Sequence, residues 1–160
     1  MQGVVEQVSL SRGGLPKAPV PLAFLTLLGF EGDSVAHPTI HGGPLKAALL
    51  VTSEALDELR AQGYPVFPGA LGENLTLRGL DRRVLAPGTR LAAGDAVMEV
   101  TTLRAPCASL DVYGPAIKSA VYRKGMTVED PRWGLGGFYT CVLETGLVRV
   151  ADTVRILSQA

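Results

Sequence analysis

The side chain with the most distinctive chemistry in this sequence is the thiol of Cys107, which follows the segment Val100-Thr101-Thr102-Leu103-Arg104-Ala105-Pro106. Alternating β-branched residues predict a strand over residues 97–103, which Pro106 ends by withholding a backbone donor. The cysteine is thus expected where a strand becomes a loop or helix, a common place for reactive groups on a rigid scaffold. The Arg104 guanidinium and a helix starting at Ala108 would both favour the thiolate, the form that attacks electrophiles and binds soft metals.

The alternative for Cys107 is a structural role, because free cysteine is among the most buried residue types and often packs as a small hydrophobe. The second cysteine, Cys141, shares a face of a predicted strand with Tyr139 and Leu143 and is expected in the core. Two cysteines do not make a disulfide framework, so the reducing cytoplasm is the simplest compartment.

Several loops carry residues suited to binding a small anionic molecule. Lys17 ends a glycine-rich loop, and it is either a solvated charge or a contact for an anionic ligand. Gly42-Gly43 would let the backbone approach a ligand closely, with exposed amides forming an anion-binding nest. Glu73-Asn74 follows another glycine-rich turn, where the two side chains serve turn formation or hydrogen-bond a heterocycle.

Both histidines of the chain lie in one loop with an aspartate: Asp33, His37 and His41. Imidazole and carboxylate groups are common zinc ligands. A long glycine- and proline-rich loop does not fix ligand geometry as a helix does, and a further ligand would have to come from elsewhere. Turn formation or contact with a small molecule is therefore favoured over a zinc site.

Composition narrows the class of protein. A chain of 160 residues, 47% of them hydrophobic, predicts a single folded domain over residues 1–160. Fifteen basic and fifteen acidic residues cancel, which leaves no electrostatic signature of binding to nucleic acid or to anionic lipid.

The N-terminus lacks the pattern of a signal peptide. The most apolar run, residues 19–30, is too short to span a bilayer, so a cytoplasmic protein without membrane partners is expected.

The predicted elements are mainly strands. They cover residues 4–10, 20–28, 45–51, 75–77, 97–103, 138–143, 147–150 and 154–157, with helices over 54–62 and from Pro115 to Lys124. Residues 138–143 and 147–150 are expected to pair as a hairpin around Thr145-Gly146. The 19 glycines and 11 prolines suit short strands joined by turns. We therefore predict a closed or nearly closed β-barrel with two or three short helices.

Four segments, in order, resemble the MOSC domain family, which is named after the C-terminal domain of molybdenum cofactor sulfurase. They are Glu31-Gly32-Asp33 with His41-Gly42-Gly43, Gly72-Glu73-Asn74-Leu75-Thr76, Arg104-Ala105-Pro106-Cys107, and Trp133-Gly134-Leu135-Gly136-Gly137-Phe138-Tyr139. The match looks most like the stand-alone bacterial members. The chain departs from the family at Thr140-Cys141, where Ala-Arg is usual, and at Ala151-Asp152, where Gly-Asp is usual. At the first departure, the chain lacks the basic side chain that the family usually has there, and with it one contact.

The resemblance implies a β-barrel in which Cys107 binds the molybdenum of the pterin cofactor, molybdopterin, or carries sulfur as a persulfide. A thiolate is a soft ligand that suits molybdenum, and an anionic pterin phosphate needs cationic or amide partners. The residues expected to contact the cofactor, from the charges and from the matching segments, are Lys17, Asp33, His41, Gly42, Gly43, Lys46, Glu73, Asn74 and Arg104.

Three functions follow as expectations from the resemblance. The leading one is an oxidoreductase that uses the molybdenum cofactor to reduce small N-hydroxylated substrates. The chain shows no flavin or iron–sulfur motif, so an external electron donor is expected as a partner. The second is a sulfur carrier, in which a pyridoxal-phosphate-dependent cysteine desulfurase supplies a persulfide on Cys107. The third is a non-catalytic module that binds the cofactor.

Overall fold

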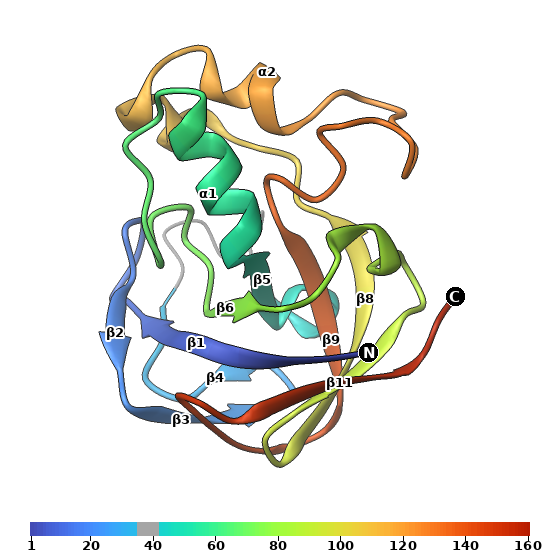
Figure 1. Cartoon of the computed structure of the whole chain (residues 1–160). Coiled ribbons are helices and arrows are strands. Elements are labelled where there is room, and N and C mark those ends of the chain that lie inside the picture. Colours follow the sequence, from blue (N-terminus) through green and yellow to red (C-terminus); the bar gives the residue numbers. More distant parts are fainter. Residues whose placement is uncertain (35–41) are drawn as a thin grey trace.

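A computed structural model, which describes residues 1–34 and 42–160, shows a mainly β protein with its helices gathered at one end (Figure 1). The strands are β1 (Gln2–Leu10), β2 (Ala18–Val20), β3 (Leu22–Thr26), β4 (Gly29–Phe30), β5 (Ala48–Thr52), β6 (Leu75–Arg78), β7 (Arg90–Ala93), β8 (Ala96–Leu103), β9 (Phe138–Glu144), β10 (Gly146–Arg149) and β11 (Thr153–Ser158). The helices are α1 (Ser53–Ala61) and α2 (Ile117–Val121), with 3-10 turns η1 (Pro44–Lys46), η2 (Arg82–Val84) and η3 (Ala108–Tyr113).

Seven strands close a barrel in the order β11-β7-β8-β9-β5-β6-β1, because β11 also pairs with β1. Neighbouring strands are antiparallel except β5 and β6, which pair in parallel and are connected through α1. β2 extends the sheet beyond β1. The predicted closed β-barrel is thus confirmed.

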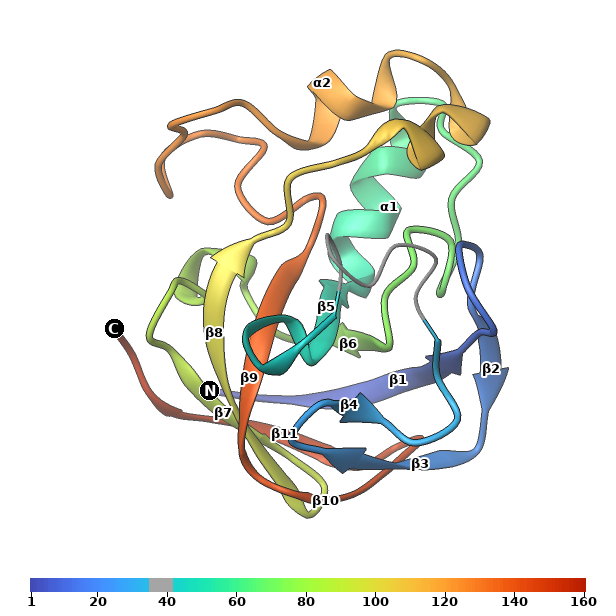
Figure 2. The same ribbon diagram turned by 180° about the vertical axis from the view of Figure 1, so that it is seen from behind.

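A second sheet of three strands, β10-β3-β4, lies at the end of the barrel away from α1 and α2 (Figures 1 and 2). Apolar side chains from both sheets form the main core, which includes Val8, Leu25, Leu75, Met98 and Phe138. Burial of this apolar surface is the dominant favourable contribution to folding. The barrel interior is therefore a packed core and not a channel.

A smaller core joins the helices to the barrel. Leu56 and Leu59 of α1 are fully buried against Leu71, Leu110 and Ile117. The Thr52 side chain caps α1 by accepting a hydrogen bond from the Ala55 amide at 3.1 Å. The helix predicted over 54–62 is confirmed, whereas only residues 117–121 of the second predicted helix are α-helical. Within the described residues, no helix is long and apolar enough to cross a membrane.

The hairpin predicted for residues 138–143 and 147–150 is wrong. β9 pairs with β5 and β8 inside the barrel, whereas β10 pairs with β3 in the second sheet. The chain leaves one sheet for the other at Gly146, where the backbone packs so tightly against Asp95 that a Cβ would lie 2.6 Å from its carbonyl oxygen. The short turn joins two different sheets.

Two further local predictions are corrected. The strand predicted over 20–28 divides at Pro21 into β2 and β3, which pair with different strands. Cys141 is not a core residue. Its neighbours in β9, Thr140 and Val142, are buried inside the barrel, so the side chain of Cys141 faces the other way. Cys141 is partly exposed on the outside of the barrel.

Candidate functional site

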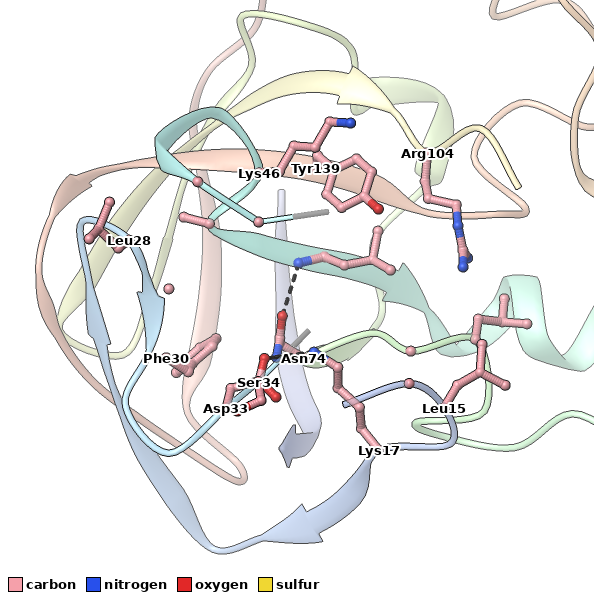
Figure 3. A pocket seen from close by; sticks show the side chains of 18 of the residues that line it. Leu15, Lys17, Leu28, Phe30, Asp33, Ser34, Lys46, Asn74, Arg104 and Tyr139 are labelled. Atoms are coloured by element: carbon pink, nitrogen blue, oxygen red, sulfur yellow. Dashed lines mark hydrogen bonds and ion pairs between the residues drawn. The ribbon is translucent and has the colours of Figure 1, made fainter. Parts of the chain in front are cut away.

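A cavity of about 240 Å³ opens beside the barrel, below the helices, and collects residues from loops that are far apart in the sequence (Figure 3). Three cationic residues line it: Lys17, Lys46 and Arg104. Asp33 is the carboxylate among its described lining residues, so the formal charge of the lining is positive. Such a surface favours an anionic ligand.

One wall of the cavity is a polar network centred on Asp33. Its carboxylate accepts hydrogen bonds from the Ser11 amide at 2.9 Å, from Lys17 Nζ at 2.6 Å and from Asn74 Nδ2 at 2.8 Å. The Lys17 side chain is 7% exposed and that of Asp33 is 10% exposed. The structure therefore brings together three of the predicted contact residues, and Asp33 already neutralises much of the Lys17 charge.

Backbone contacts hold this wall in place. Asn74 Oδ1 accepts a hydrogen bond from the Leu49 amide at 3.2 Å, so the side chain joins β5 to the Asp33 network. The Lys17 amide donates to the Gly69 carbonyl at 2.9 Å. Gly69 has φ 91°, and a Cβ there would lie 2.3 Å from the Lys17 carbonyl oxygen. A glycine is therefore required where the loop containing Gly69 approaches Lys17.

Arg104 enters the cavity from the opposite wall, where Tyr139 and Lys46 also lie (Figure 3). It is 4% exposed, and its Nη1 donates to the Gly136 carbonyl at 3.3 Å. Its Nε is buried and has no hydrogen-bond partner among the described residues. A buried charged donor without a partner is costly, so this Nε marks a position where a bound anion would complete the site.

Cys107 is partly exposed and is not among the residues that line the cavity. Its Sγ is 2.7 Å from the hydroxyl of Ser109, which does line the cavity. Partial burial opposes the thiolate, but hydrogen bonds from the Ser109 hydroxyl and amide and the charge of Arg104 outweigh it, so the pKa of Cys107 is lowered. The arrangement provides a nucleophilic, partly accessible sulfur beside the cationic wall.

Ser109 and Tyr139 are cavity residues that the sequence prediction did not select. Tyr139 is 7% exposed, and Lys46 Nζ lies 5.1 Å from the centre of its ring, within range of a cation–π contact. Burial raises the pKa of the Tyr139 phenol, and the charge on Cys107 contributes in the same direction. Tyr139 ends one of the segments that resemble the MOSC family, and this resemblance was the signal that could have identified it as a site residue. Its position in an alternating strand suggested a core residue instead.

Glu73 was predicted to contact the ligand, but the structure does not bring it to the cavity. It is fully buried, and its carboxylate accepts hydrogen bonds from the Leu71 amide and the Thr76 hydroxyl, both at 3.1 Å. Burial raises the pKa of this carboxyl group, although these hydrogen bonds counteract the shift. Glu73 holds its own loop, which presents the neighbouring Asn74 to the cavity.

Gly42 and Gly43, which were predicted to approach a ligand closely, line the cavity, and both have positive φ, 93° and 85°. Gly43 lies just before η1, which carries Lys46. His37 and His41 lie outside the described residues. Among the residues that are described, no cluster of three histidine, cysteine or acidic side chains could hold a metal ion.

The sequence profile of the MOSC domain matches residues 37–155. This chain belongs to the MOSC domain family. The match includes Cys107, Arg104 and Lys46, and it extends through the segment that ends at Tyr139. The family predicted from the sequence is therefore confirmed.

Two bacterial proteins resemble this MOSC chain in sequence. The uncharacterized protein YflK of Bacillus subtilis is 33% identical over 150 residues, which cover 91% of this chain and 64% of YflK. The protein YiiM of Escherichia coli is 33% identical over 93 residues, which cover 56% of this chain and 42% of YiiM. The MOSC chain thus spans less than two thirds of the length of either relative.

Solved structures share the fold of this MOSC chain. YiiM from Geobacillus stearothermophilus superposes with a TM-score of 0.75 at 23% identity, covering 98% of this chain and 75% of that one. YiiM from Escherichia coli gives a TM-score of 0.72 at 24% identity, covering 100% and 71%. The YUAD protein of Bacillus subtilis gives 0.71 at 16% identity, covering 96% and 94%.

The described residues fit the molybdenum cofactor that the MOSC family is associated with in general. The unpartnered Nε of Arg104 and the Lys46 ammonium suit an anionic phosphate. The pKa of Cys107 is lowered, which favours its thiolate, a soft ligand that suits molybdenum. Lys17 is the exception, because its charge is already paired with Asp33.

Proposed function

We propose that this MOSC protein binds the molybdenum cofactor with Cys107 as the metal ligand and reduces small N-hydroxylated compounds. One observation carries the proposal: a positively charged cavity, with a buried guanidinium nitrogen that has no partner among the described residues, lies beside a thiol whose pKa is lowered. The thiolate provides the metal ligand and the cations provide the counter-charge for the anionic end of the cofactor.

Each wall of the cavity has its own part in this proposal. Arg104 would offer its Nε to the phosphate, while the hydrogen bond from its Nη1 to the Gly136 carbonyl fixes the direction of the guanidinium. Lys46 adds a second cation, positioned by its contact with the Tyr139 ring. The Asp33 network keeps the facing wall rigid, because buried polar groups with several partners hold a single arrangement.

The bound cofactor would supply the two-electron transfer that the reaction needs. The N–O bond of the substrate would break with uptake of two electrons and two protons: the hydroxyl takes one proton and leaves as water, and the nitrogen takes the other in its place. A separate electron donor provides the two electrons. Cys107 would hold the metal, and its thiol is partly exposed and in contact with Ser109 of the cavity lining.

A second candidate is the sulfur carrier, which the partial exposure of the Cys107 thiol favours. A thiolate there is accessible to the persulfide of a cysteine desulfurase, and sulfane sulfur would pass from the desulfurase to Cys107. This function predicts an additional mass of ~32 Da, one sulfur atom, on Cys107. It does not require an anion in the cavity.

The test is reduction of 6-hydroxylaminopurine by protein purified from a host that makes the cofactor, with reduced methyl viologen as the electron donor. Formation of adenine by wild-type protein and by Cys141→Ser, but not by Cys107→Ser, is the expected result. Protein that carries molybdenum but reduces neither this compound nor benzamidoxime would support the non-catalytic module. A persulfide on Cys107 in protein without molybdenum would support the sulfur carrier.

A further inference from the structure

The loop that leads into β9, residues 130–137, is bound by two arginines from different parts of the chain. Turns within the loop use the carbonyl groups of Asp130, Arg132 and Gly134. Arg82 and Arg104 bind four of the other carbonyl groups, two each. Most of this loop is buried, and buried carbonyl groups need hydrogen-bond partners. Both arginines therefore contribute to holding the loop in place.

Arg82, the first residue of η2, binds the first half of the loop. Its Nε donates to the Trp133 carbonyl at 2.7 Å, and its Nη2 donates to the Pro131 carbonyl at 3.1 Å. The same guanidinium forms an ion pair with Glu58 of α1 at 3.0 Å, and the Arg82 side chain is only 16% exposed. Because a guanidinium is planar and rigid, it fixes the two carbonyl groups relative to each other.

Arg104 binds the second half of the same loop. Its amide donates to the Gly137 carbonyl at 2.9 Å, and its Nη1 donates to the Gly136 carbonyl at 3.3 Å. The latter is the hydrogen bond that its guanidinium makes to the described part of the chain, and the side chain extends from there into the cavity (Figure 3). The position of the Gly136 carbonyl therefore sets the direction of the Arg104 guanidinium.

The two halves of the loop are joined by a turn, in which the Gly137 amide donates to the Gly134 carbonyl at 3.1 Å. Gly134 also lies close to Arg82, since a Cβ added to this glycine would be 3.3 Å from Arg82 Cβ. Hydrogen-bonded segments of this kind carry coupling between sites, so a displacement at Trp133 is expected to reach Gly136.

We propose that Arg82 is a positioning residue of the anion site. By holding the Pro131 and Trp133 carbonyl groups, it keeps the Gly136 carbonyl where it directs Arg104 into the cavity. Arg82 is not among the residues that line the cavity, so it acts only through the loop. The inference rests on the proposed function for the identity of the natural anion, but orthophosphate and cofactor-free protein are enough to test it.

The first arm of the test is the affinity for orthophosphate, measured by calorimetry. Arg82→Gln is expected to bind phosphate roughly tenfold more weakly, a loss of the size seen when an outer-shell partner that orients a metal ligand is removed. Arg82→Lys keeps the charge but not the planar fork, and it should lose most of this affinity too. Glu58→Gln breaks the ion pair, leaves the carbonyl contacts in place and should bind like wild type. Arg83→Gln is the matched control, because it removes the neighbouring charge from an exposed pair with Asp81.

Equal phosphate affinity in Arg82→Gln and wild type overturns the inference. An equal loss in Arg83→Gln also overturns it, because the effect would then be one of general charge. The pH midpoint of Cys107 alkylation by iodoacetamide is a second readout, since the Arg104 charge helps to lower the pKa of this thiol. In a Cys141→Ser background, Arg82→Gln should move the midpoint to higher pH. If wild-type protein binds no phosphate, the anion site of the proposed function fails, and this midpoint still decides the role of Arg82.

The second arm uses wild-type protein and does not depend on the folding of any variant. Trp133 is the single tryptophan of the chain, and its indole Nε1 donates to the Leu85 carbonyl at 3.0 Å. Because coupling between sites is reciprocal, phosphate bound at Arg104 should tighten the loop and lower the quenching of Trp133 fluorescence by acrylamide. Quenching that saturating phosphate leaves unchanged overturns the inference.

Discussion

Lys17 Nζ lies 2.6 Å from Asp33 Oδ2 in a pair whose side chains are at least nine-tenths buried. The pair joins Lys17, at the end of a glycine-rich loop, to Asp33 in the wall of the cavity. Asn74 Nδ2 donates a further hydrogen bond to the same carboxylate. A buried pair of this kind fixes geometry more than it stabilises the fold, since both charges have lost their water. Its main role here is to shape one wall of the cavity.

Breaking this pair from one side is expected to destabilise the protein. Lys17→Met leaves the Asp33 carboxylate buried without a cation, at a cost of ~3 kcal/mol. The double variant Lys17→Met/Asp33→Asn loses less than the sum of the single variants, because neither charge remains unpaired. Urea unfolding measures all three. Arg90→Met, which breaks the exposed pair with Glu99, is the control and costs under ~1 kcal/mol. Additive single and double effects would contradict the coupling.

The thiol of Cys107 is expected to react at lower pH than an ordinary cysteine. Its pKa is lowered from the ordinary value of 9.0, so in a Cys141→Ser background the rate of alkylation by iodoacetamide rises with pH through a midpoint below that value. Ser109→Ala removes the hydroxyl 2.7 Å from Sγ and moves the midpoint upward. A midpoint that Ser109→Ala leaves in place would show that this hydrogen bond does not stabilise the thiolate.

Replacement of Arg104 by lysine is expected to weaken anion binding although the charge is kept. The buried Nε, which has no described partner, is absent from lysine. Affinity for orthophosphate in cofactor-free protein, measured by calorimetry, falls roughly tenfold or more, the effect of one charge-assisted hydrogen bond. The exposed Arg90→Lys serves as the control. Equal phosphate affinity in Arg104→Lys and wild type would remove Arg104 from the site.

The stability of the loop that presents Asn74 depends on the protonation of Glu73. Because burial raises the pKa of Glu73 above its ordinary value of 4.5, folding favours the neutral acid. Its contribution is complete below that ordinary value and declines as the pH rises through the raised pKa. Relative to Glu73→Gln, wild-type protein therefore becomes more stable as the pH falls from 7 towards 4.5. Urea unfolding at several pH values checks this, and a constant difference would contradict it.

The barrel could be predicted from the sequence because its signals are local. Alternation marked the strand that is β8, and the helix predicted over residues 54–62 corresponds to α1. Pairing between strands is not local, so the exit of β10 into a second sheet was missed. The strict alternation expected of β9 also fails at its start, where Tyr139, which lines the cavity, is buried beside the core residue Phe138.

The site was predictable where residue chemistry and the matching segments agreed. Lys17, Asp33 and Asn74 were selected separately and meet in one network. Glu73 was selected because it is adjacent to Asn74 in a matching segment. Adjacent side chains in a turn point in different directions, and the Glu73 side chain is buried in the protein interior. The direction of a side chain in a loop depends on contacts such as that between the Leu71 amide and Glu73. No short motif in the sequence specifies these contacts.

The most direct test of the central claim is the molybdenum and pterin content of wild type, Cys107→Ser and Cys141→Ser purified from a host that makes the cofactor. Metal analysis and pterin fluorescence should give near-stoichiometric values for wild type and Cys141→Ser. Cys107→Ser should lose molybdenum, because its hydroxyl is a poor substitute for a soft thiolate. Equal molybdenum in Cys107→Ser and wild type, or none in wild type, would contradict the account.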